Sequence, residues 1–141
     1  FIEHNPEENY FTFDKPTLES LVPVALFDLV INNADRKGSH ILLDENRKIW
    51  LIDHGLCFHT EPKLRTVIWD FAGQEIPPSL LADISRLRQP LGDKTQLYVD
   101  LHKHLKDSEI RAIRRRIDAL LDHPVFPQPD PERRPYPWPL V

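Results

Sequence analysis

The chain has 141 residues, of which 40% are hydrophobic and 28% are charged, and its formal net charge is -4. These values are typical of one soluble globular domain, and they exclude the basic composition that a nucleic-acid partner normally requires. No apolar run approaches the roughly 20 residues of a transmembrane segment, and the single Cys57 excludes an intrachain disulfide and fits a reducing, cytoplasmic location.

The first part of the chain predicts a strand, a helix and a β-hairpin. Residues 9–13 (NYFTF) alternate well enough for a short strand, and the apolar run 21–31, preceded by Pro16, predicts a buried helix. Residues 40–44 (HILLD) and 49–53 (IWLID) flank the polar turn ENRK, which is typical of a hairpin.

The second part predicts three helices, over residues 77–88, 94–105 and 108–122, with Ser108 as the N-cap of the last one. The expected core stripe of this last helix is Ile113, Ile117, Leu120 and Leu121. Its arginines (111, 114, 115 and 116) lie mostly on the other faces, where they indicate either a solvated surface or one that binds anions or a membrane.

The chain has 14 prolines, and they gather in the C-terminal stretch HPVFPQPDPERRPYPWPLV. Proline lacks an amide donor and has a fixed φ, so this tail cannot be a regular helix or a central strand. We expect an extended tail over the surface, anchored by Tyr136, Trp138 and Leu140. A disordered tail or a proline-rich ligand segment is the alternative.

Charged residues gather at one end of the expected hairpin. The stretch NADRKGSH (33–40) leads into the first strand, and DHG follows the second. Because antiparallel pairing brings these two ends together, His40 and Asp53 should be neighbours, with Asp35 on the loop beside them. Two carboxylates and a histidine can hold a divalent cation and place a general base. The alternative is that the two aspartates cap turns, Arg36 pairs with a surface acid, and His40 is a hydrogen-bonded strand-end residue.

The stretch NNADRKGSHILLDENRKIWLIDHGLCF resembles the catalytic core of the phosphoinositide 3- and 4-kinase superfamily, whose pattern is D-R-H-x-x-N, a hairpin, then I-D-x-G. The chain is still more similar to a bacterial family of uncharacterised proteins related to those kinases. That family shares the NADRK and DHG turns, KLRTVIWDFAG and the terminal RPYPWPLV. The resemblance implies an α+β fold: the mostly helical C-terminal lobe of a protein-kinase-like protein, with a small hairpin that carries the catalytic and metal-binding loops.

The resemblance also implies roles for five residues. Asp35 matches the catalytic aspartate that accepts or orients the proton of the attacking hydroxyl, and Arg36 matches the arginine that follows it. Asp53 matches the aspartate that bridges the nucleotide phosphates through Mg²⁺. His40 falls where the second metal ligand, an asparagine, is usual, and Lys37 falls where the lipid kinases have histidine. The implied cofactors are ATP with Mg²⁺ or Mn²⁺, and imidazole suits Mn²⁺ or Zn²⁺ better than Mg²⁺.

In this interpretation the whole chain, 1–141, is a single lobe and the N-terminal lobe is a missing partner. Without that lobe we expect weak ATP binding and no phosphate transfer. The acceptor stays open between a lipid, a protein and a small molecule. Lys63 and Arg65, in the counterpart of the activation segment, are candidates for binding an anionic substrate, and a folded surface turn is the alternative. The expected parts are 1–13 (hinge or strand remnant), 21–75 (catalytic core), 78–122 (helical part) and 123–141 (tail).

Residues 69–75 (WDFAGQE) resemble a switch segment of small GTPases. Those proteins also need G-x-x-x-x-G-K-[ST] to bind phosphates with backbone donors. No two of the four glycines are close enough to form that loop, which excludes a GTPase.

Two further alternatives remain. One is a kinase-like module that binds nucleotide or a partner without transferring phosphate, which the altered His40 and Lys37 positions favour. The other is a metallohydrolase, although its residues match no known zinc-binding spacing. Its ligands would come from Asp35, His40, Asp53, His54 and His59.

Overall fold

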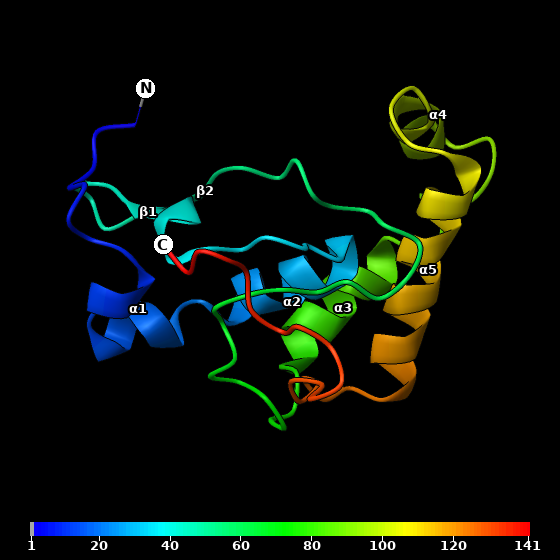
Figure 1. Ribbon diagram of the computed structural model, residues 1–141. Helices are drawn as coiled ribbons and strands as arrows, with labels where there is room; N and C mark the ends of the chain where they lie inside the picture. Colours follow the sequence, from blue (N-terminus) through cyan, green and yellow to red (C-terminus); the bar gives the residue numbers. More distant parts are fainter. Residues whose placement is uncertain (1) are drawn as a thin grey trace.

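The computed structural model describes residues 2–141 (Figure 1). This part of the chain folds into five α-helices, two short 3-10 helices and one two-stranded antiparallel sheet, which confirms the α+β class. Within residues 2–141, no helix is both long and apolar enough to cross a membrane. In chain order the elements are η1 (Tyr10–Thr12), α1 (Lys15–Glu19), α2 (Val22–Ile31), η2 (Gly38–His40), β1 (Ile41–Leu43), β2 (Ile49–Leu51), α3 (Pro78–Arg86), α4 (Gln96–His102) and α5 (Asp107–Asp122).

The strand predicted over residues 9–13 is wrong. These residues form the 3-10 helix η1, capped by the Asn9 side chain, which accepts a hydrogen bond from the Phe11 amide at 3.0 Å. An alternating pattern makes a strand only when a neighbouring strand supplies the ladder, and the sheet in residues 2–141 contains only β1 and β2.

The buried helix predicted over residues 21–31 is confirmed as α2, and a short separate helix, α1, precedes it. Asp14 caps α1 by accepting a hydrogen bond from the Thr17 amide at 3.0 Å. Pro23 lies in the first turn of α2, where proline needs no donor, and Asn32 ends α2 in the left-handed conformation with φ 54°. Apolar residues are buried on nearly every side of α2, which makes it the central helix: Val24, Ala25, Leu26, Val30 and Ile31.

The predicted hairpin is confirmed, with strands slightly shorter than expected. Ile41 pairs with Leu51 and Leu43 pairs with Ile49. Beyond the ladder, the Ile52 amide still donates to the His40 carbonyl at 3.1 Å. The start of β1 therefore lies directly beside the end of β2, as the site prediction requires.

Helix α5 packs against α2, α3 and α4, and its expected core residues Ile113 and Ile117 are buried. Ser108 is not the N-cap, because α5 begins at Asp107. The Glu109 carboxylate instead accepts a hydrogen bond from the Lys106 amide at 2.7 Å, which satisfies this backbone donor at the start of the helix. Helices α3 and α4 are present but shorter than predicted.

The tail after α5 contains no helix or extended strand, which confirms the expected effect of its prolines. The anchors, however, are wrong: Trp138 is 75% exposed, and Tyr136 and Leu140 are also exposed. Phe126 and Pro137 are buried in their place. The tail thus packs through the Phe126 and Pro137 side chains, while Tyr136 and Trp138 face solvent.

Backbone hydrogen bonds attach the tail to the segments around the hairpin. Thr66 donates its amide to the Pro135 carbonyl at 3.0 Å, and Gly38 donates its amide to the Leu140 carbonyl at 2.7 Å. The C-terminus consequently lies beside the hairpin, far in sequence from the residues that hold it (Figure 1).

Candidate active site

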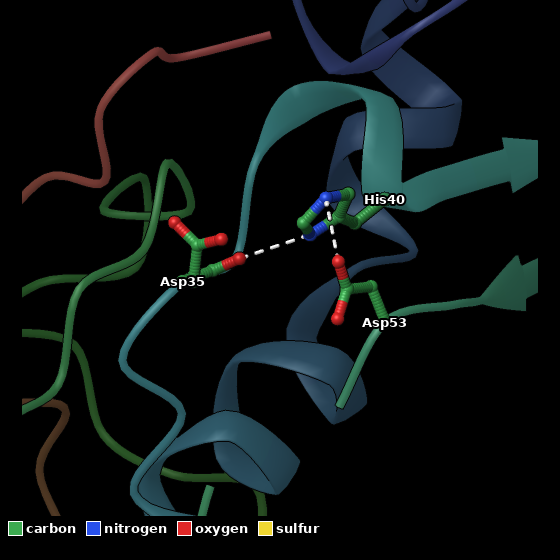
Figure 2. A group of neighbouring side chains, drawn as sticks. All are labelled: Asp35, His40 and Asp53. Atoms are coloured by element: carbon green, nitrogen blue, oxygen red, sulfur yellow. Dashed lines mark hydrogen bonds and ion pairs between the residues drawn. The ribbon is translucent and has the colours of Figure 1, made fainter. Parts of the chain in front are cut away.

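Three side chains meet at the open end of the hairpin. Asp35 follows α2, His40 ends η2 and Asp53 follows β2 (Figure 2). Nε2 of His40 lies 3.6 Å from Oδ2 of Asp53, and one possible ligand atom from each of the three residues lies within 4.8 Å of the others. The predicted proximity of these three residues is therefore confirmed.

The His40 ring is held in one orientation. Its Nδ1 lies 2.9 Å from the backbone carbonyl of Asp35 (Figure 2). Because a carbonyl only accepts, Nδ1 carries the proton, and Nε2 of the neutral ring keeps a lone pair on the side of Asp53. Histidines that bind metals are commonly oriented by such a second hydrogen bond. His40 is also buried, so the ring has little room to turn.

Asp53 has φ 54°, in the left-handed region that residues other than glycine rarely adopt. Its side chain is exposed, and Oδ1 accepts a long hydrogen bond from the Gly55 amide at 3.4 Å. Strained backbone of this kind gathers at functional sites. The conformation supports a hypothesis of function for Asp53.

Arg36 is completely buried and joins the two loops. Its guanidinium forms an ion pair with Asp28 of α2 at 2.9 Å. It also donates to the carbonyls of Ile52 at 3.1 Å and His40 at 3.3 Å. Arg36 therefore does not pair with a surface acid, and it faces no solvent from which a substrate could reach it. Its contacts are those of a residue that positions the loops.

Asp28 and Asn33 are site residues that the sequence analysis missed. The Asn33 side chain donates to Oδ1 of Asp28 at 3.0 Å and accepts from the Asp35 amide at 3.0 Å. Both residues are buried, so they fix the backbone of Asp35 from within the core. The available signal was a lone acidic residue inside the apolar run of α2.

Lys37 forms an ion pair with the carboxylate of Asp35, the expected base. Its Nζ is 3.4 Å from Oδ2 of Asp35, and both side chains are about one-fifth exposed, at 21% and 22%. The loop that matches the catalytic loop of the kinases thus presents a carboxylate and an ammonium group side by side at the edge of the site.

His54 and His59 do not join the three-residue group. Nε2 of His54 lies 3.0 Å from the Arg36 guanidinium, which only donates, so His54 accepts and is neutral. Burial first, and then the Arg36 charge, lower the pKa of His54. The His59 ring accepts from the Glu61 amide at 3.1 Å. The five-residue ligand set of the metallohydrolase hypothesis is therefore reduced to three.

Lys63 and Arg65 line a groove to which Asp35, His40 and Asp53 do not contribute. The backbone of Arg65 nevertheless holds the catalytic-loop counterpart, since its amide donates to Asn33 at 2.9 Å and its carbonyl accepts from Arg36 at 3.0 Å. The two candidate substrate-binding residues thus line a groove that the three-residue group does not reach.

The three-residue group suits a divalent cation. It combines two carboxylates with an imidazole whose Nε2, in the neutral ring, offers a lone pair in a fixed direction. Carboxylate oxygens are the ligands that Mg²⁺ and Mn²⁺ prefer, and the exposed Asp53 leaves the site open to a ligand.

Comparisons with known proteins agree with this geometry. A family model described as phosphatidylinositol 3- and 4-kinase matches residues 1–110. Protein Rv2133c of Mycobacterium tuberculosis (strain ATCC 25618 / H37Rv) is 47% identical over 116 residues, which cover 82% of this chain and 41% of that protein. The match thus spans less than half of the bacterial relative, whose name states no activity. No solved structure matches. The family model covers well over half of the chain, which therefore belongs to the phosphatidylinositol 3- and 4-kinase family.

Proposed function

We propose that residues 1–141 form the C-terminal lobe of an ATP-dependent phosphotransferase that acts on a hydroxyl acceptor, with the N-terminal lobe supplied by another part of the same protein. The observation that carries the proposal is the convergence of Asp35, His40 and Asp53 at the open end of the hairpin. Membership in the kinase family supports it.

In this proposal Asp35 accepts or orients the proton of the acceptor hydroxyl. Its carboxylate is partly exposed, and its backbone is fixed by Asn33 and by the His40 ring. Lys37 is assigned to orienting a phosphate group, because its ammonium lies beside that carboxylate and is a point charge suited to phosphate. Arg36 positions both loops from the core.

Asp53 and His40 would hold Mg²⁺ or Mn²⁺. When bound, the metal-nucleotide complex would supply the phosphoryl group and neutralise its charge. The hydrogen bond from His40 Nδ1 to Asp35 means that the same ring would link the metal side of the site to the base side. A substitution in either loop should therefore alter the position of the side chains in the other loop.

The test separates the two aspartates in the full-length protein. Asp53→Asn should abolish metal-dependent ATP binding in calorimetry, whereas Asp35→Asn should retain binding and lose turnover. Asp93→Asn is a matched control, since Asp93 is exposed and contributes nothing to the three-residue group. Equal loss of ATP binding in both site variants, or full activity in either, would contradict the assigned roles.

A non-catalytic nucleotide-binding module is the second candidate. The observation in its favour is the ion pair between Lys37 and Asp35, which occupies the expected base. This candidate predicts metal-dependent ATP binding by the wild-type protein with no turnover on lipid, protein or small-molecule hydroxyls, and no effect of Asp35→Asn on binding.

A further inference from the structure

A groove lies away from the three-residue group. It is a groove of about 920 Å³ between residues 60–65, helix α5 and tail residues 127–135. This volume is in the range of pockets that hold small molecules. Its apolar lining comes from all three segments, from α2 and from the ring of Trp69: Leu29, Leu64, Trp69, Ala112, Ala119 and Pro127.

The groove is basic in an acidic chain. It contains six cationic side chains and two acidic ones, a difference of four positive charges (6 − 2), whereas the whole chain carries -4. Of the two acids, Asp130 pairs with Arg133 at 3.2 Å. No carboxylate within residues 2–141 forms an ion pair with any of the five other cations: Lys63, Arg65, Arg115, Arg116 and Arg134.

Arg116 lines this groove and is only partly satisfied. Its Nε donates to the Val30 carbonyl at 2.8 Å and one terminal nitrogen donates to the His59 carbonyl at 3.2 Å. The other terminal nitrogen, Nη2, is buried and has no hydrogen-bond partner among residues 2–141. A buried donor without an acceptor costs free energy that a bound acceptor would recover.

Neighbouring positive charge adds to this cost. Burial, and after it the adjacent Arg115, lower the pKa of Arg116 to about 10. The helical period of α5 predicts that both arginines lie away from its core stripe, and in the structure they line the groove opposite residues 60–65 and the tail. An anion in the groove would offset the repulsion and accept from Nη2.

We propose that this groove is a binding site for a small phosphate monoester with an apolar body. Arginine forks match phosphate oxygens, and the apolar lining suits the remainder of the ligand. Asp35, His40 and Asp53 do not line the groove, so the proposal does not depend on phosphate transfer.

The experiment titrates phenyl phosphate into the full-length protein by calorimetry, without ATP or metal. One molecule should bind per chain, more tightly than inorganic phosphate, which offers the charge alone. Arg115→Gln combined with Arg134→Gln should weaken binding by about tenfold or more, since each lost charge-assisted hydrogen bond is worth about that factor. Both arginines are exposed, so the double variant should fold.

Two controls localise the ligand. Arg114→Gln removes an exposed arginine of α5 that does not line the groove, and it should leave the affinity unchanged. Asp53→Asn should also leave phenyl phosphate binding unchanged, which separates this proposal from that of the active site.

Three results would overturn the proposal. The first is an absence of phenyl phosphate binding, and the second is wild-type affinity in the double variant. The third is binding to phosphatidylserine-containing vesicles, but not to phosphatidylcholine vesicles or phenyl phosphate, because it would make the basic groove part of a membrane-facing surface.

Discussion

Two arginine–aspartate ion pairs in this protein have the same length and opposite surroundings. Arg36 and Asp28 are 2.9 Å apart, with side chains 0% and 1% exposed. Arg47 and Asp14 are also 2.9 Å apart, but both side chains are 56% exposed. The first pair connects α2 to the candidate active site, and the second connects the hairpin turn to the start of α1.

The difference shows that distance alone does not rank an ion pair. Water screens the exposed charges, and Arg47 without its partner would simply be hydrated. The buried guanidinium has no such option, because every donor must find an acceptor inside the protein. Arg36 meets that demand with a carboxylate, two loop carbonyls and His54, and this is how its burial fixes the loops.

The largest expected effect comes from breaking the buried pair on one side. Asp28→Asn would leave the Arg36 charge in the core without a counter-charge, and we expect a loss of about 3–5 kcal/mol in the free energy of unfolding. Urea unfolding of the full-length protein measures it. Asp14→Asn is the matched exposed control, and a similar loss in both variants would show that burial is not the deciding factor.

Arg36→Lys tests the geometry of the buried pair while keeping its charge. An ammonium cannot bind Asp28 as a fork and reach the carbonyls of Ile52 and His40 together. We expect a stability loss of about 1–3 kcal/mol from unpaired acceptors. Mn²⁺ affinity, measured by titration, should fall by about tenfold as the ligands lose their support. Unchanged Mn²⁺ affinity in a folded variant would mean that Arg36 does not position them.

Arg47→Gln should have a much smaller effect. The lost pair is exposed, and Asp14 keeps its hydrogen bond from the Thr17 amide. We expect a small decrease in the urea midpoint that disappears at high salt, where the wild-type pair is screened as well. A decrease that persists at high salt would show that the interaction is not mainly electrostatic.

The reactivity of Cys57 tests the same contrast between the surroundings of the buried pair and those of the exposed pair. Burial, and then the charge of Asp28, raise the pKa of its thiol to about 11. The thiolate is therefore scarce at neutral pH, and alkylation by iodoacetamide should be slow and rise by about tenfold per pH unit below that pKa. Fast labelling at neutral pH would contradict this environment. Labelling of the Arg47→Gln variant should match the wild type.

The sequence alone predicted which residues meet at the open end of the hairpin. His40, Asp53 and Asp35 meet because a short polar turn leaves antiparallel pairing as the main choice for two apolar strands, and that pairing brings their far ends together. The order of acid, strand, turn, strand and acid also carried the family resemblance that the comparison over residues 1–110 supports.

Only the tertiary structure decided which polar residues are buried partners. Asp28 lies in an apolar helix and Arg36 in a polar loop, and no local periodicity relates them. They meet because Asn32 ends α2 in the left-handed conformation and the chain turns back. The strand expected at residues 9–13 failed for a related reason, since within residues 2–141 no strand pairs with it.

The basic groove could not be predicted from local sequence patterns either. Arg115 and Arg116 follow the helical period of α5, but the wall facing them comes from residues 60–65 and 127–135. Helical periodicity gives the direction of a side chain relative to its own helix. What lies opposite that side chain depends on where distant segments pack. Here Thr66 donates its amide to the Pro135 carbonyl and Arg133 donates to the Pro62 carbonyl, and these hydrogen bonds hold the tail beside residues 60–66.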